Sequence, residues 1–547
     1  MLPKPEACNG CPMRNIGLGF VPGRGTLSPD FIGVAQAPGS DEVHSDDPQP
    51  LIGPSGRVFS RALYENNVTR QKVYLTNVLK CQPPKDKLPS KDILLPAVAH
   101  CTNAYLRKEL AVVKGPVLAI GGLSLYHMTG KELPILTYRG YPYWSERYSR
   151  WTIGTIHPAM VFKTATGSAD KSPPAAIIPA LQSDIRKINR FTKPADIEEN
   201  IDPSESDIRL VVEQALDQRL VAVDIETPGF EKDEDEVFTS AKDIHLIGVA
   251  TRDNHAIVCS PSQFELLRPI FDPHNHVVQI GQNYVSDLLS LSARYGFSVS
   301  DTHVEDIMLQ FHALYSDLPK RLAVIASFFT TLPYWKLSKK DWKAGVSPER
   351  FMRYNAKDTI ANWMCFHAMQ PLIEQNGLTD TYQAMLGLVP FAVQMYELGI
   401  NTDQTTAMRI QLEHAQVNDA IVKALTTALP GFNIESPIQV MELLYDRMGL
   451  PEQTHKVKGV VKRTSNDEAL TALQRMFPQN KTLGLIQTYR GNKKIIEYID
   501  HPARGRVHSS LKITGTASGR LENREPNLMQ QPDIVRVAYI ADEECDR

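Results

Sequence analysis

The chain has 547 residues, of which 42% are hydrophobic and 22% are charged, and its formal net charge is −3. This length allows roughly three to five domains, each with its own core. No apolar run approaches the roughly 18 residues that a membrane span needs, and the first residues lack the apolar core of a signal peptide. We therefore expect a cytoplasmic protein with no membrane partner.

Residues 1–190 are predicted to form one α/β unit. Short apolar runs with the length of β-strands alternate with helical stretches, which is the pattern of a wound parallel sheet. The expected strands are Phe31–Ala35, Val73–Thr76 and Val117–Ile120, and a helix is expected over Ile177–Ile188.

Four of the seven cysteines lie in the first fifth of the chain: Cys8, Cys11, Cys81 and Cys101. In an intracellular chain, clustered cysteines favour a metal site over disulfides. Four thiolates suit either a [4Fe–4S] cluster or a Zn²⁺ ion. The simpler alternative is that these residues are reduced thiols in a core.

Several motifs in this unit resemble family 4 uracil-DNA glycosylases. They are Gly33-Val-Ala-Gln-Ala-Pro-Gly39, Gly53-Pro-Ser-Gly56, Thr76-Asn-Val-Leu-Lys-Cys81-Gln-Pro-Pro84 and Thr155-Ile-His-Pro158. The resemblance implies an α/β/α sandwich in which the four cysteines hold a [4Fe–4S] cluster. It also implies that Asn77 hydrogen-bonds a flipped uracil and that His157 faces its O2 during glycosidic cleavage.

Two positions of the implied uracil pocket depart from the family pattern. Gln36 stands where the family has an acidic residue, and Leu51 stands where an aromatic side chain would stack on the base. Stacking of a base on an aromatic ring is worth about 1–3 kcal/mol. Two interpretations follow: an active glycosylase, or a retained fold that only binds DNA or senses uracil.

A polar segment, residues 191–207, is predicted to be a linker, and a second α/β unit is expected over residues 208–376. Within this unit Asp224 and Glu226 lie two apart on a predicted strand, so both side chains project from one face. Asp287 and Asp358 fall on helical segments. If the fold gathers these four carboxylates, divalent cations must neutralise them, and two such ions about 4 Å apart are the usual machinery for phosphodiester hydrolysis.

Three segments of the second unit resemble the proofreading 3′–5′ exonuclease domain of family A DNA polymerases: Asp224-Ile-Glu226, Asn283-Tyr-Val-Ser-Asp287 and Tyr354-Asn-Ala-Lys-Asp358. The resemblance implies a ribonuclease H-like fold and two Mg²⁺ or Mn²⁺ ions held by Asp224, Glu226, Asp287 and Asp358. Tyr354 would orient the attacking water, and Asn283 would contact DNA. A chance Asp-x-Glu on a strand is the alternative for the first segment alone.

Residues 377–503 are predicted to be mostly helical, and residues 504–547 irregular and β-rich. From His455 to Glu525 fourteen Lys and Arg face six Asp and Glu, which favours phosphate contact. This part resembles the thumb and the beginning of the palm of family A polymerases. By that resemblance the residues that contact primer–template are Arg490, Lys493, Lys494, Arg506, His508, Thr514, Arg520, Asn527 and Gln530.

The sequence predicts an α/β multi-domain protein acting in DNA replication, resembling the N-terminal part of a phage-type family A DNA polymerase. Because the family's palm aspartates and fingers would follow Arg547, we expect no polymerisation by this chain alone, and a second polypeptide or a missing C-terminal region as partner. Two alternatives remain. One is a DNA-binding accessory subunit, and the other is a repair nuclease–glycosylase. If the source is a phage, the location is the cytoplasm of a bacterial host.

Overall fold

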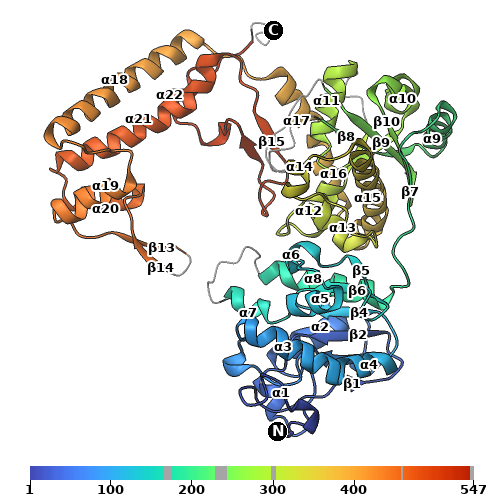
Figure 1. Ribbon diagram of the computed structural model, residues 1–547. Helices are drawn as coiled ribbons and strands as arrows, with labels where there is room; N and C mark the ends of the chain where they lie inside the picture. The colour runs from blue at the N-terminus through green and yellow to red at the C-terminus, as the bar shows by residue number, and fades with distance from the viewer. Residues whose placement is uncertain (166–173, 228–242, 297–302, 458–459, 543–547) are drawn as a thin grey trace. The chain divides into compact units, whose positions relative to one another are not determined.

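The computed structural model describes residues 1–165, 174–227, 243–296, 303–457 and 460–542 (Figure 1). The described residues divide into two compact units, one reaching to Leu386 and the other beginning at Gly387. The first unit contains two six-stranded sheets, and we call the parts built on them the first α/β half (β1 to α8) and the second α/β half (β7 to α16). None of the described helices is both long enough and apolar enough to cross a membrane.

The first α/β half has a sheet of order β1-β3-β2-β4-β6-β5, in which β3, β2, β4 and β6 are parallel and the two edge strands are antiparallel. The strands are β1 Arg24–Gly25, β2 Phe31–Ala35, β3 Val73–Asn77, β4 Val117–Ile120, β5 Pro142–Ser145 and β6 Arg150–Thr155. The helices are α1 Ser40–His44, α2 Pro54–Glu65, α3 Lys91–Cys101, α4 Arg107–Val112, α5 Gly122–Thr129, α6 Ile135–Tyr138, α7 Met160–Ala165 and α8 Pro174–Asn189.

Alternate residues of β2 enter different cores, because successive side chains on a strand point to opposite faces. Phe31 and Ala35 pack with buried side chains of α2 and α8, whereas Ile32 and Val34 pack with those of α3 and α5. Helices therefore cover both faces of the sheet, and this half is an α/β/α sandwich, as the sequence predicts.

The second α/β half has a sheet of order β12-β11-β8-β9-β10-β7. Its strands are β7 Glu198–Asn200, β8 Leu220–Glu226, β9 Leu246–Arg252, β10 His255–Cys259, β11 Val278–Gly281 and β12 Val304–Asp306. Strand β9 is antiparallel to both of its neighbours, β8 and β10, and β11 runs parallel to β8. The segment predicted as a linker, residues 191–207, thus contributes a strand, since β7 pairs in parallel with β10.

The helices of the second half carry three of the residues predicted to be catalytic, Asp287, Tyr354 and Asp358. These helices are α9 Glu205–Gln218, α10 Phe264–Phe271, α11 Val285–Tyr295, α12 Ile307–Leu314, α13 Leu322–Phe329, α14 Lys339–Ala344, α15 Pro348–Gln375 and α16 Thr379–Leu386. The long helix α15 packs on β8 and β9. Its buried residues include Asn355, Ala356, Asp358 and Thr359, so one turn of the helix presents polar side chains to the sheet.

The two halves meet through a buried polar contact. Arg139 donates to both carboxylate oxygens of Asp184 and, through Nη1, to Ser327 Oγ at 3.0 Å. Next to it Gly140 adopts φ 76°, and a Cβ on this residue would lie 2.4 Å from the carbonyl oxygen of Ser327. Gly140 therefore lies so close to the backbone near the end of α13 that a residue with a Cβ would not fit there.

The substitution Gly140→Ala is expected to destabilise the protein, because the new methyl group would collide with the backbone of α13. Overpacking of this kind costs about 1–3 kcal/mol, in addition to the strain of the left-handed backbone. Gly130→Ala is the matched control, since Gly130 has φ 70° but nothing within 4 Å of its Cβ position. Thermal unfolding should show a clearly larger loss for Gly140→Ala. Equal losses would contradict the close contact.

The second unit is mainly helical and contains α17 Leu388–Leu398, α18 Gln404–Ala428, α19 Pro437–Met441, α20 Asp467–Met476, α21 Lys481–Arg504 and α22 Asp533–Arg536. The long helices α18 and α21 lie along one another (Figure 1). Two hairpins complete the unit: β13 Thr454–Val457 with β14 Val460–Arg463, and β15 Ser510–Lys512 with β16 Glu522–Arg524.

The segment predicted to be β-rich, residues 504–547, has less strand than expected. Its described strands β15 and β16 are three residues each, and α22 follows them. The strand-forming residues of this segment are interrupted by Gly515, Gly519 and Pro526, which limit the length of any strand. Residues 543–547 lie outside the described residues.

Candidate active sites

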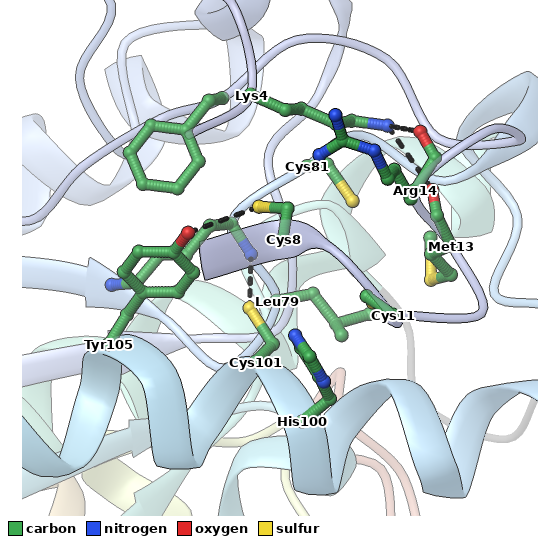
Figure 2. Close-up of a pocket in the computed structure, with 12 residues that line it drawn as sticks. Lys4, Cys8, Cys11, Met13, Arg14, Leu79, Cys81, His100, Cys101 and Tyr105 are labelled. Carbon is green, nitrogen blue, oxygen red and sulfur yellow. Dashed lines mark hydrogen bonds between the residues drawn. The ribbon is translucent and has the colours of Figure 1, made fainter. Parts of the chain in front are cut away.

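The four cysteines predicted to bind a metal group line one pocket of the first α/β half (Figure 2). Cys8 ends the short helical turn Glu6–Cys8, and Cys11 lies in the loop that follows. Cys81 comes shortly after β3, and Cys101 ends α3. Tyr105 Oη lies 3.1 Å from the Cys8 sulfur, and the backbone N–H of Lys80 donates to the Cys101 sulfur at 3.2 Å. Segments nearly a hundred residues apart thus converge on one thiol cluster.

Two thiols of this pocket, those of Cys81 and Cys101, favour their neutral form. Burial raises the pKa of Cys81 to about 11 and that of Cys101 to about 12. The neighbouring cysteines add to both shifts, because thiolates close together repel. Since metals bind the thiolate, loading this pocket with a metal must release protons.

The four sulfur atoms of this pocket are not as close together as the ligands of a single metal ion. Among the described residues, the metal-ligand atoms that gather within 4.8 Å of one another belong to Asp224, Glu226 and Asp358, and the four sulfurs form no such group. A tetrahedral Zn²⁺ with Zn–S bonds of about 2.3 Å requires sulfur separations of about 3.8 Å.

A largely buried ion pair lies close to the thiols and was not predicted from the sequence. Lys80 Nζ is 2.7 Å from both carboxylate oxygens of Glu109, and the Lys80 side chain is almost fully buried. Thr76 Oγ1 donates to the same carboxylate at 2.7 Å. Lys80 stands next to Cys81 in the sequence, but only the fold reveals that its head group points at Glu109 of α4.

The residues predicted to contact uracil lie at the carboxyl edge of the first sheet. Gln36 follows β2, Asn77 ends β3 and His157 follows β6, and these strands are parallel. Ligands of open α/β sheets bind at this edge. Asn77 is buried, and its Nδ2 has no hydrogen-bond partner within the described structure. A buried amide without a partner is costly, which indicates a position prepared for an acceptor on a ligand.

Two other residues of the predicted uracil pocket have structural roles. Leu51 is 3% exposed, adopts φ 57° and packs in the core with α2 and α8. Its backbone N–H donates to Glu42 Oε1 at 2.6 Å. Gln36 lies against the turn after β4, where Leu123 N–H donates to its Oε1 at 3.4 Å.

Three of the four predicted nuclease carboxylates come together in the second α/β half. Oxygens of Asp224, Glu226 and Asp358 lie within 4.8 Å of one another. Asp224 and Glu226 come from β8, and Asp358 comes from the face of α15 that packs on this strand. Removal from water and the repulsion of the nearby carboxylates raise the pKa of Asp224 well above its ordinary value. This is the electrostatic condition in which a cation binds well.

Asp287 faces the same strand without joining the group of three. Its Oδ1 accepts from the backbone N–H of Ile225 at 3.1 Å, and burial raises its pKa to about 7. The turn before it is fixed by buried Asp306, whose carboxylate accepts from the N–H groups of Asn283 at 3.2 Å and Tyr284 at 2.9 Å. The role of Asp306 as the support of this turn was not predicted from the sequence.

Three residues that sequence analysis missed hold the acids in place. Lys336 Nζ lies 2.8 Å from Asp358 Oδ2 and 2.9 Å from Tyr354 Oη, and Trp335 Nε1 donates to Asp358 Oδ1 at 2.5 Å. Asn355 Nδ2 donates to Asp224 Oδ2 at 2.7 Å. Asn355 lies inside the Tyr354–Asp358 motif and was within reach of sequence reasoning. Trp335 and Lys336 belong to an irregular loop with no periodic pattern.

The DNA-contact candidates of the second unit divide into exposed and internally paired residues. Lys494, Arg520 and Gln530 are exposed. Several others have partners within the chain: Arg490 with Ser465, Lys493 with Glu435 at 2.7 Å, Arg506 with Asp542, His508 with the Tyr396 carbonyl, and Asn527 with the Met529 N–H. Thr514 is buried. Two of these residues, Arg490 and Lys493, line the same pocket of the second unit.

Comparison with known proteins bears on both units. The uracil DNA glycosylase superfamily model matches residues 22–181, and the DNA polymerase family A model matches residues 402–545. The chain thus joins a region similar to uracil-DNA glycosylases to a region similar to family A DNA polymerases. The first match covers most of the α/β/α sandwich with Asn77, and the polymerase family A region comprises most of the second unit.

Relatives of the two parts differ in how much of their length is matched. A type-4 uracil-DNA glycosylase of Thermotoga maritima is 26% identical over 34% of this chain and 91% of the relative. DNA polymerase I of Caldicellulosiruptor bescii is 30% identical over 29% of this chain but only 19% of the relative. The chain thus spans about a fifth of that polymerase. Among solved structures, the POL domain of Pol1 from M. smegmatis has a TM-score of 0.49 with 17% identity, covering 63% of this chain and 59% of that one.

Proposed function

We propose that this chain takes part in DNA replication as a 3′–5′ proofreading exonuclease joined to a family A primer–template-binding region. The observation that carries the proposal is the convergence of Asp224, Glu226 and Asp358 within 4.8 Å. These three carboxylates would hold one Mg²⁺ or Mn²⁺ ion, and Asp287 with Asp224 would complete a second site. Hard cations prefer such oxygen ligands.

Each residue of the proposed nuclease site has a distinct task. The carboxylates bind the cations, which would supply a hydroxide nucleophile and stabilise charge on the phosphate. Tyr354, one helical turn from Asp358 on α15, would orient the attacking water through its hydroxyl. The expected product is a mononucleotide released from the 3′ end of a DNA strand.

A labelled single-stranded oligonucleotide tests the nuclease proposal. With Mg²⁺ or Mn²⁺, a 5′-labelled strand should shorten one nucleotide at a time, and a 3′-labelled strand should release labelled mononucleotide at once. Chelation of the metal should stop both. Stable oligonucleotide under all metal conditions would instead favour the alternative of a DNA-binding accessory subunit, which would need no nuclease.

We infer that the four cysteines hold a [4Fe–4S] cluster. The donor set is four thiols on one pocket, and their sulfurs are not gathered as closely as a single Zn²⁺ requires. The match to type-4 uracil-DNA glycosylases is consistent with this donor set. Burial raises the pKa of the Cys101 thiol, but the charge of Lys80, which is paired with Glu109, acts to lower it and so favours the thiolate form.

Protein purified without oxygen is expected to be brown and to absorb near 400 nm, in the region typical of iron–sulfur charge transfer. Iron and sulfide should each be present at about four per chain, and Cys101→Ala should lose both the colour and the iron. The matched control is Cys259→Ala, a buried cysteine of the second α/β half. A colourless protein with one zinc would contradict the cluster.

A second activity, removal or recognition of uracil in DNA, is favoured by the unpartnered Nδ2 of buried Asn77 at the carboxyl edge of the first sheet. This N–H group would donate to a carbonyl of a flipped uracil, and His157 would approach the base from the end of β6. Because Leu51 packs in the core, the base would lack an aromatic ring at that position.

For this second activity we expect Asn77→Ala to lower uracil release, or the affinity for uracil-containing oligonucleotides, by about 5- to 150-fold, since about 1–3 kcal/mol is lost with a buried hydrogen bond. A duplex with thymine in place of uracil is the matched substrate control. If the parent chain neither releases uracil nor prefers it over thymine, the proposal for this pocket fails.

A further inference from the structure

The loop that holds Asp358 of the proposed nuclease site also packs against the first α/β half. This loop, Pro333–Lys336, follows α13 and precedes α14. Its last two residues donate to both oxygens of Asp358, through Trp335 Nε1 at 2.5 Å and Lys336 Nζ at 2.8 Å. The orientation of Asp358 is therefore set from outside its own helix.

Aromatic rings of the first α/β half hold the preceding residues of the loop. The Tyr334 ring lies 4.4 Å from that of Tyr138 and 5.1 Å, edge-on, from that of Tyr141. The Tyr141 ring also meets Trp335 at 6.2 Å. Aromatic pairs at these separations and angles contribute attraction beyond the burial of their surface.

The part of the first α/β half that carries these rings is held by several contacts with α13. Tyr141 is fully buried, and its hydroxyl donates to the Ala323 carbonyl oxygen at 2.5 Å, at the start of α13. At the other end of α13, Ser183 Oγ donates to the Phe328 carbonyl oxygen at 3.0 Å, and the Arg139 guanidinium lies over the Phe328 ring. A single apolar cluster includes residues of α8 and of α13 and α15. The first α/β half therefore contacts both ends of α13, the helix that precedes the loop.

We propose that the glycosylase-superfamily domain positions the nuclease site: Tyr138 and Tyr141 hold Tyr334 and Trp335, and through them Trp335 and Lys336 orient Asp358 for metal binding. An ionised carboxylate has about four acceptor positions, so Asp358 can keep both donors and still bind a cation. Tyr334, Trp335 and Lys336 are positioning residues. The proposal rests on the proposed exonuclease and adds a dependence of that site on the other domain.

The test is the Mn²⁺ affinity of the full chain carrying Tyr334→Ala, measured directly by electron paramagnetic resonance of free Mn²⁺ and also by the metal dependence of 3′-nucleotide release. Loss of outer partners of a metal ligand typically costs 10–100-fold in metal affinity or activity. We expect release at low Mn²⁺ to fall by about that factor and to recover at high Mn²⁺, because a loosened Asp358 weakens metal binding without removing the ligand. Tyr334→Phe keeps the ring and should shift the Mn²⁺ dependence less than Tyr334→Ala does.

Two further variants make the test specific. Trp144→Ala removes an aromatic side chain of the first α/β half that pairs with Trp151 and not with the loop, and it should leave the Mn²⁺ dependence unchanged. Tyr138→Ala removes the ring at 4.4 Å from Tyr334 and should shift the Mn²⁺ dependence in the same direction as Tyr334→Ala. It replaces Tyr334→Ala if that variant does not fold.

The outcomes separate the inference from the function on which it rests. An unchanged Mn²⁺ dependence in both Tyr334→Ala and Tyr138→Ala would overturn the coupling while the exonuclease stands. A loss that is equal at every Mn²⁺ concentration would overturn it too, because it would indicate damage to the fold. No release by the parent chain, in comparison with Asp224→Ala, would remove the exonuclease and the inference together.

Discussion

Asp224→Ala is expected to slow the release of 3′-terminal nucleotides by about a thousandfold, because a metal ion contributes several kcal/mol of charge stabilisation in the transition state and each 1.36 kcal/mol is a factor of ten in rate. Asp224 is the residue whose pKa is raised by Asp358, Glu226 and Asp287 in addition to burial, so it faces all three acids. Single-turnover kinetics with a 3′-labelled strand at saturating Mg²⁺ would measure the loss.

The matched control for this variant is Asp243→Ala, an exposed aspartate of the same half whose nearest cation is Arg294 at 3.9 Å. It should retain the parent rate. The metal-free Asp224→Ala protein should unfold no earlier than the parent, because the substitution removes one of several carboxylates that repel each other. A parent-like rate in Asp224→Ala would exclude this site as the source of the nuclease activity.

Asp184→Ala is expected to lower the free energy of unfolding by about 3–5 kcal/mol, which is the usual cost of leaving one member of a buried ion pair without its partner. Arg139 is 5% and Asp184 0% exposed, and the guanidinium meets both carboxylate oxygens. Without Asp184, the positive charge would remain at the junction of the two α/β halves without a carboxylate partner, beside Ser327 Oγ, the Ala180 carbonyl and the Phe328 ring.

Chemical denaturation monitored by tryptophan fluorescence would measure this change. Asp47→Ala is the control, because it breaks the Arg24–Asp47 pair, in which both side chains are about 60% exposed, and exposed pairs contribute little. If the two variants lose the same stability, the Arg139–Asp184 contact does not hold the junction together.

Local patterns in the sequence were enough to predict much of the architecture. Short apolar runs located β2, β3, β4 and β8, and Asp287 and Asp358 lie on helices, as predicted. The gathering of Asp224, Glu226 and Asp358 followed from a resemblance over three segments, not from any one of them. The four cysteines were found by composition alone.

What could not be predicted depends on contacts between distant segments. β7 has the polar composition of a linker and becomes a strand only because β10 offers it a free edge. Lys336 and Lys80 are ordinary lysines in the sequence, and their partners Asp358 and Glu109 lie 22 and 29 residues away. The aromatic contacts around Tyr334 join positions almost two hundred residues apart.

The pairing of β7 with β10 has a consequence for dividing this protein into pieces. A fragment that begins at α9 would leave the N–H and C=O groups of β10 open along one side, and such edges recruit strands from other molecules. It would also uncover the apolar side chains of α13 that α8 now shields. Cutting the chain between the two sheets would therefore leave the second α/β half prone to aggregation. A cut near residue 387 keeps both sheets together and follows the division of the described residues into two compact units.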